Sequence, residues 1–123
     1  MTEEVELIKS IAEKLDAAGI DYMLTGSMAM AFYSTPRMTR DIDLIIQIDT
    51  AKAQRLIELL GDEFYVDEKA VLDAIQHRGM FNIIHTESLI KVDFIIRKPE
   101  AFRVQEFNHR RRIELQGVFV SVV

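Results

Sequence analysis

Two aspartates, Asp41 and Asp43, are separated by one isoleucine at the start of a run of residues with high β-strand propensity. Successive side chains of a strand alternate between its faces, so both carboxylates are expected on the same face. Like charges held that close repel each other unless a cation neutralises them. The pair therefore indicates a cation site, and carboxylate oxygen is a ligand that Mg²⁺ prefers.

A third acidic residue, Asp93, interrupts a second apolar run over residues 90–96. If the two strands are neighbours, three carboxylates converge at about 4.5–5.5 Å across the ladder. Two divalent ions roughly 3.5–4 Å apart could then activate an attacking oxygen and stabilise a leaving pyrophosphate. The structural alternative is that all three are exposed strand-end or edge-strand acids. Acids are disfavoured inside apolar strands, which favours the metal-binding interpretation.

A Gly-Ser turn, Gly26-Ser27, lies upstream between a short apolar strand and an apolar helix. Free backbone N–H groups at the N-terminus of a helix suit a phosphate. Ser27 is a candidate phosphate contact and equally a helix N-cap, and the two roles are compatible. A phosphate-binding turn beside a cation site is typical of metal-dependent phosphoryl or nucleotidyl transfer.

Three basic residues accompany the acids. Arg37 and Arg40 precede Asp41, and either could bind a triphosphate or simply be solvated on a loop. Lys91 is expected on the same strand face as Asp93, where it contacts phosphate or forms a salt bridge with an acid. Further along, residues 97–112 are rich in arginine and lysine. This segment either follows a nucleic-acid backbone such as that of tRNA or is a solvated face.

Alternating helices and strands are expected to position these residues. Apolar residues at helical spacing predict helices over residues 5–18, 26–33, 50–60, 68–77 and 99–108. Residues 34–40 are expected to form a loop. Alternating or β-branched runs predict strands over residues 22–25, 41–48, 80–86, 89–97, 110–115 and 118–123. The pattern predicts an α/β (α+β) fold: a mixed, twisted sheet with helices packed mainly on one face.

Composition restricts the class of protein. The chain has 123 residues, a formal net charge of −5 and no cysteine, which excludes disulfides and thiolate metal sites. Its acidic N-terminus is unlike a signal peptide, and no uncharged run is long enough for a transmembrane helix. We therefore expect a cytoplasmic protein that does not enter membranes.

The last strand, residues 118–123, is apolar on at least one face and needs a cover. Three covers are open: a C-terminal region beyond this sequence, a second copy of the chain in a homodimer, or a neighbouring strand of the same sheet. The first is favoured. Residues 1–123 are thus expected to be a single domain that lacks a C-terminal helical region.

The order of Gly26-Ser27, then Asp41-Ile-Asp43, then a lone Asp93 on a later strand resembles the polymerase-β-type nucleotidyltransferase superfamily. The segment Thr39-Arg-Asp-Ile-Asp-Leu44 is most similar to small prokaryotic members, which include abortive-infection toxins of toxin–antitoxin systems. This resemblance implies that Gly26, Ser27, Arg40 and Lys91 contact the nucleotide. It implies that Asp41, Asp43 and Asp93 are catalytic metal ligands for Mg²⁺ or Mn²⁺.

The resemblance also implies an enzyme that transfers a nucleoside monophosphate from a nucleoside triphosphate to a hydroxyl of RNA, protein or a small molecule. Asp93 would help to deprotonate that hydroxyl. Two other functions stay open: a catalytically weak nucleotide-binding module, and a toxin controlled by an antitoxin partner. Relatives of the toxin kind continue into a helical region with no counterpart in residues 1–123.

Overall fold

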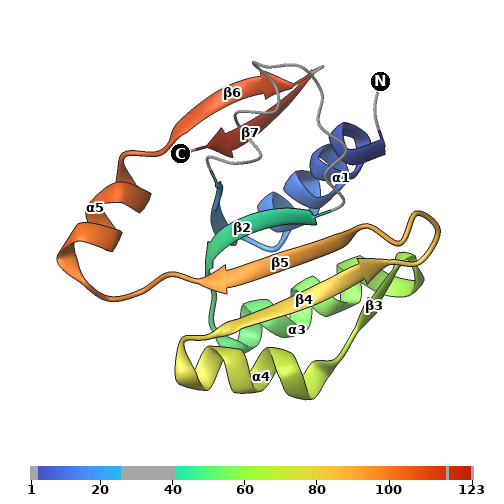
Figure 1. Ribbon diagram of the computed structural model, residues 1–123, viewed down its shortest axis with the longest axis horizontal. Coiled ribbons are helices and arrows are strands. Elements are labelled where there is room, and N and C mark those ends of the chain that lie inside the picture. Colours follow the sequence, from blue (N-terminus) through green and yellow to red (C-terminus); the bar gives the residue numbers. More distant parts are fainter. Residues whose placement is uncertain (1–2, 26–40, 116, 123) are drawn as a thin grey trace.

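The computed structural model describes residues 3–25, 41–115 and 117–122 of the chain. In this part of the chain a single seven-stranded sheet carries four α-helices and one short 3₁₀ helix (Figure 1). In chain order the elements are α1 (Glu3–Ala17), β1 (Asp21–Leu24), β2 (Asp41–Gln47), α3 (Thr50–Leu60), η1 (Gly61–Glu63), β3 (Phe64–Val66), α4 (Glu68–His77), β4 (Met80–His85), β5 (Lys91–Ile96), α5 (Ala101–Asn108), β6 (Arg111–Leu115) and β7 (Val118–Val122).

The strand order across the sheet is β3-β4-β5-β2-β1-β7-β6. Strands β2 and β5 are parallel, as are β1 and β7, and the other neighbours are antiparallel. The sheet is therefore mixed, and the predicted fold class is confirmed. The predicted strands and four of the predicted helices are present, and none of their ends differs from the prediction by more than two residues. The expected helix over residues 26–33 and the loop over 34–40 lie outside the described residues.

The two faces of the sheet differ. The core face packs against α1, α3 and α4. It carries alternate residues of the two central strands, all buried: Ile42, Leu44, Ile46, Val92, Phe94 and Ile96. The intervening residues of the same strands point to the opposite side, which we call the outer face. Helix α5 contributes to the outer face through Phe107.

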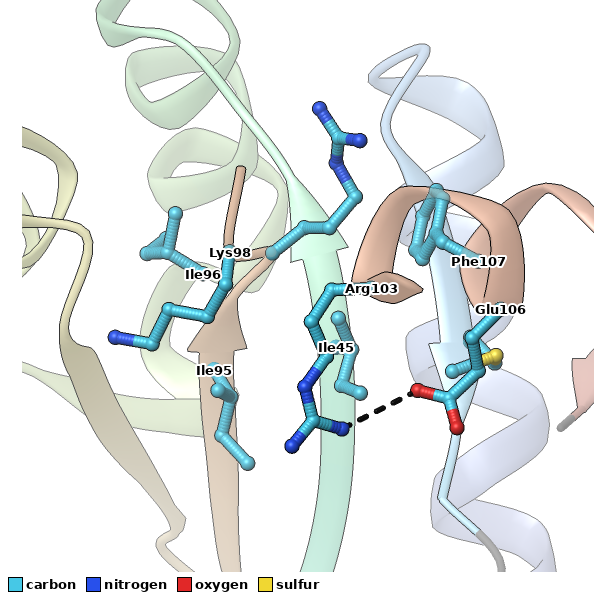
Figure 2. Close-up of a pocket in the computed structure, with 9 residues that line it drawn as sticks. Ile45, Ile95, Ile96, Lys98, Arg103, Glu106 and Phe107 are labelled. Atoms are coloured by element: carbon cyan, nitrogen blue, oxygen red, sulfur yellow. Dashed lines mark hydrogen bonds and ion pairs between the residues drawn. The ribbon is translucent and has the colours of Figure 1, made fainter. Parts of the chain in front are cut away.

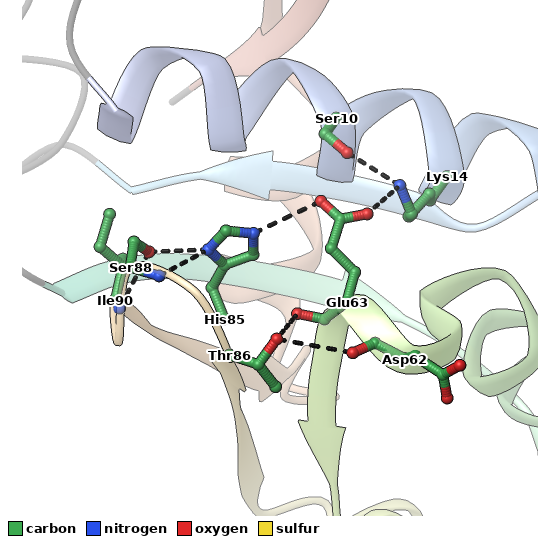
Figure 3. Close-up of polar contacts among 8 residues, drawn as sticks. All are labelled: Ser10, Lys14, Asp62, Glu63, His85, Thr86, Ser88 and Ile90. Atoms are coloured by element: carbon green, nitrogen blue, oxygen red, sulfur yellow. Dashed lines mark hydrogen bonds and ion pairs between the residues drawn. The ribbon is translucent and has the colours of Figure 1, made fainter.

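Strand β3 was not predicted from the sequence. It has three residues, of which only Phe64 is buried, so it shows no readable alternation. A polar cluster holds it and η1 against α1 (Figure 3). Glu63 lies 3.5 Å from Nζ of Lys14 on α1 and 3.5 Å from Nε2 of His85 on β4. The cluster joins α1 to the edge of the sheet at which the β4–β5 turn begins.

Strand β7 has a strand of this chain on each side, β1 and β6. Val120 and Val122 are buried, and the backbone N–H of Ser121 donates to the hydroxyl of Tyr22 on β1 at 3.2 Å. Burial raises the pKa of the Tyr22 phenol above its ordinary value of 10.0. Of the three covers considered for this strand, pairing within its own sheet is therefore present. The further C-terminal region and the homodimer remain predictions.

Within the described ranges, no helix has the length and apolar character needed to cross a bilayer.

Candidate functional site

Asp43 and Asp93 lie directly opposite each other on the parallel strands β2 and β5. The register that pairs them also pairs Ile42 with Val92 and Leu44 with Phe94. Because those neighbours are buried on the core face, the two aspartates point to the outer face. Both are half-buried. The sequence predicted that these carboxylates would lie close together if their strands were neighbours. The strands are neighbours, and Asp43 and Asp93 lie close together.

The register places two further polar residues beside the pair. Lys91 lies opposite Asp41, one pleat before the aspartates, and Asn82 of β4 lies opposite Asp93. Asn82, Asp93 and Asp43 thus form a row across three adjacent strands on the outer face. Sequence reasoning did not single out Asn82, although its alternation with buried Phe81 and Ile83 could have placed it on that face.

Part of the predicted site lies outside the described residues. The segment that is not described contains Gly26, Ser27, Arg37 and Arg40. For Asp41 the structure describes the backbone but not the side chain. The last described residue before the gap is Thr25, whose backbone N–H donates to the carbonyl of Asp43 at 3.1 Å. The chain therefore enters the Gly-Ser segment from a position next to the aspartate pair.

The described donors fit a hard divalent cation in their chemistry. Asp43 and Asp93 supply carboxylate oxygen, and Asn82 adds an amide oxygen. Among the described side chains no three histidines, cysteines or acids are grouped closely enough to hold a metal ion by themselves. Mg²⁺ commonly binds through one or two carboxylates and completes its shell with water and substrate phosphates. A pair of carboxylates is consistent with that mode of binding.

A pocket of about 240 Å³ lies on the same outer face, between the sheet and α5 (Figure 2). Its floor is formed by Met23, Ile45 and Ile95, and α5 adds Phe107. Ile45 and Ile95 each follow an aspartate of the pair by two residues, which is roughly 7 Å along a strand. The pocket and the aspartate pair are therefore adjacent on one surface.

The rim of this pocket is charged. Arg103 lies over it and forms an ion pair with Glu106 at 3.4 Å (Figure 2). The stem of Lys98 also lines it, while the Lys98 ammonium donates to the carbonyl of Arg78. Arg97 completes the rim, with its guanidinium 5.9 Å from the centroid of the Phe107 ring. Sequence reasoning placed these cations in a basic segment but did not predict the pocket.

Two arginines in the rest of the basic segment, Arg110 and Arg112, have acidic partners. Arg110 lies 3.6 Å from Asp21, and Arg112 lies 3.9 Å from Asp16. Arg110 also packs over Phe107, 4.4 Å from the ring centroid. These contacts favour a structural role for the two arginines over a role in binding a nucleic-acid backbone.

One solved structure supports the fold, and a second is a weaker match. A nucleotidyltransferase-like protein from Paracoccidioides brasiliensis aligns with 98% of this chain at a TM-score of 0.55 and 19% identity. The protein JHP933 from Helicobacter pylori aligns with 98% of the chain at a TM-score of 0.44 and 12% identity. The chain spans 60% of the first structure's length and 53% of the second's. No curated protein matches the sequence significantly.

A family model supplies the sequence evidence. The model described as aminoglycoside-2''-adenylyltransferase matches residues 7–119, a range that contains both Asp43 and Asp93. The predicted nucleotidyltransferase superfamily is thereby confirmed, and such families generally use divalent metal ions. Since the match covers most of its length, the chain belongs to the aminoglycoside-2''-adenylyltransferase family of nucleotidyltransferases.

Proposed function

We propose that this protein transfers a nucleoside monophosphate from a nucleoside triphosphate to an acceptor hydroxyl, with Mg²⁺ or Mn²⁺ bound at the aspartate pair. The observation that carries the proposal is the position of Asp43 opposite Asp93 on two parallel strands, both on the outer face. Two half-buried carboxylates this close repel each other, and a divalent cation relieves that repulsion. The site is thus suited to a metal–nucleotide complex.

Each residue has a defined role in this proposal. Asp41, Asp43 and Asp93 hold the ion, and Gly26 and Ser27 hold the triphosphate through backbone N–H groups. Arg40 and Lys91 contact phosphate oxygens. Lys91 is suited to this role because it lies one pleat from Asp93 on the same strand. When bound, the divalent ion stabilises the negative charge that develops on the leaving pyrophosphate.

Asp93 orients the acceptor hydroxyl and accepts its proton. The acceptor oxygen forms a bond to the α-phosphorus while the bond from the α-phosphorus to the bridging oxygen of the pyrophosphate breaks. Pyrophosphate leaves with the electron pair of that bond. In-line attack requires the hydroxyl on the side of the α-phosphorus opposite the leaving group, so the acceptor approaches across the outer face.

The test is a transfer assay. The protein is incubated with each common ribonucleoside triphosphate, labelled at the α-phosphate, and with Mg²⁺. Separate reactions contain total tRNA, a protein lysate or aminoglycosides. RNA and proteins are acceptors in the superfamily, and the family is described by its action on aminoglycosides. We expect label to enter one acceptor pool with the wild type and not with Asp43→Asn or Asp93→Asn. Asp73→Asn, an exposed acid on α4, is the matched control and should retain transfer.

Two results would change this proposal, the first by removing the transfer chemistry and the second by adding a controlling partner. Saturable nucleotide binding without transfer to any pool would make the protein a nucleotide-binding module. Transfer that stops when a small co-purifying protein is added would instead identify the toxin of a toxin–antitoxin pair, with the same chemistry under a partner's control. No transfer and no nucleotide binding would refute the proposal.

A further inference from the structure

We propose that the pocket between the sheet and α5 binds the terminal nucleotide unit of the acceptor, with its base in the pocket and a phosphate on Arg97. This inference rests on the proposed function, because it names the acceptor class of that site as single-stranded RNA. It goes further by assigning a binding site to residues that the transfer chemistry does not use.

The position of the pocket is the first argument. Ile45 and Ile95 form its floor on the same strands and the same face as Asp43 and Asp93. One pleat repeat, roughly 7 Å, separates each isoleucine from its aspartate. A group in the pocket is therefore held beside the reacting centre, at the distance between a base and its own ribose hydroxyls.

Size and polarity are the second argument. The volume of about 240 Å³ is below the roughly 300–1,000 Å³ of sites for drug-sized ligands, so the pocket suits a single ring system. Met23, Ile45, Ile95 and Phe107 provide apolar walls for the faces of such a ring. At the rim, the Arg103–Glu106 pair offers both donors and an acceptor to the polar edge of a base.

Arg97 is the third argument. Its Nε atom is buried and has no hydrogen-bond partner among the described residues. Buried donors are almost always paired, so an unpaired one calls for an explanation such as a ligand. Arg97 also has no acidic partner among the described ion pairs, in contrast to Arg103 and Arg110. A phosphate would supply the charge and the acceptor oxygen that this guanidinium lacks.

The location of Arg97 favours an acceptor phosphate over a donor phosphate. Arg97 is the residue after the end of β5 and follows Asp93 by four residues, roughly 13 Å along an extended chain. The triphosphate of the donor is expected at Gly26 and Ser27, which follow Thr25 in the chain, and the backbone N–H of Thr25 donates to the carbonyl of Asp43. A second anion site farther along the face therefore serves another phosphate, such as one in the backbone of a short RNA strand.

Methionine methyl groups allow a direct test without any turnover. Met23 lines the pocket, whereas Met80 lies on the outer face beside Ile95 and does not. Protein with ¹³C-labelled methionine methyl groups is titrated with a short single-stranded RNA pool of random sequence, with Met23→Leu used for assignment. We expect a saturable shift of the Met23 resonance and none of Met80. Binding should weaken with added salt.

Variants and competitors complete the test. Arg97→Ala should weaken RNA binding about tenfold, as expected for one lost charge-assisted contact, while Arg55→Ala on α3 should not. Ile95→Trp should fill the pocket and abolish the Met23 shift, and Met80→Trp is its matched control. No Met23 response to RNA would refute the inference, as would a shift caused by a mononucleotide alone with equal affinity. Displacement of RNA by Mg²⁺-nucleoside triphosphate would assign the pocket to the donor instead.

These outcomes are separable from those of the transfer assay. Asp43→Asn should abolish transfer and leave the Met23 shift by RNA intact. Ile95→Trp should lose RNA binding and keep the stabilisation by Mg²⁺-nucleoside triphosphate. If no transfer occurs but RNA still occupies the pocket, the binding site stands and the proposed chemistry fails.

Discussion

Asp43 and Asp93 lie opposite each other on parallel strands, and packing of the hydrophobic core does not require an aspartate at either position. Their strand neighbours Ile42, Leu44, Val92 and Phe94 bury the core face completely, whereas the two carboxylates lie half-buried on the outer face. Two charges of the same sign that face each other on neighbouring strands destabilise a sheet. We therefore expect the pair to cost folding stability, as is typical of a site retained for binding or catalysis.

Asp43→Asn should leave the free energy of unfolding unchanged or raise it, because the substitution removes the repulsion between two carboxylates. Chemical denaturation of the metal-free protein measures the effect. Asp67→Ala is an informative comparison, since Asp67 caps α4 by accepting from the backbone N–H groups of Lys69 and Ala70. That variant should lose about 0.5–2 kcal/mol. A similar loss in Asp43→Asn would show that Asp43 is structural.

Tyr22→Phe should lower the free energy of unfolding by about 1–3 kcal/mol, because the buried N–H of Ser121 loses its acceptor. Tyr65→Phe is the control, since Tyr65 is 64% exposed. Equal stability of the two variants would mean that the hydrogen bond between β1 and β7 contributes nothing.

Tyr22 should also make stability depend on alkaline pH. Burial raises the pKa of its phenol above 10.0, so the folded state holds this proton more tightly than the unfolded state. Stability from this group is complete below pH 10.0 and declines as the pH rises through the folded-state pKa. Denaturation curves on both sides of pH 10 should show a smaller decline for Tyr22→Phe than for the wild type. Identical declines would refute the assignment.

Ser88→Ala should destabilise the turn from β4 to β5 by about 0.5–1.5 kcal/mol. The Ser88 hydroxyl lies 2.8 Å from Nδ1 of His85 and accepts from the backbone N–H of Ile90 at 3.2 Å (Figure 3). Because the β2–β5 ladder holds Asp93 independently, nucleotide binding should persist in this variant. Glu87→Ala in the same turn is the control. Loss of nucleotide binding in Ser88→Ala would show that the turn sets the position of Asp93.

Much of the fold could be predicted from the sequence because most elements carry a clear period. The spacing of Ile8, Ile11 and Leu15 predicts α1, and the alternation of residues 41–48 predicts β2 with the correct outward residues. Strand β3 could not be predicted, since three residues with one buried side chain have no period.

The candidate site could be predicted only in part. The sequence places Asp43 and Asp93 in two separate predicted strands. Their juxtaposition depends on the pairing of β5 with β2, which are joined by a long connection. The pocket depends on α5 lying near the outer face, a tertiary contact that periodicity does not encode. From the sequence, Arg97 could be identified only as one member of a basic segment. That its Nε atom is buried follows from the structure alone.

The most direct test of the aspartate pair is thermal unfolding with a nucleoside triphosphate, in the presence and absence of Mg²⁺. If Asp43 and Asp93 bind the metal–nucleotide complex, the wild type should gain stability saturably only when both ligands are present. The gain should reach about 2.7 kcal/mol at a hundredfold excess over Kd. Asp43→Asn and Asp93→Asn should lose that gain, and Asp73→Asn should keep it. An equal gain in Asp43→Asn and the wild type would contradict the central claim that this pair forms the nucleotidyl-transfer site.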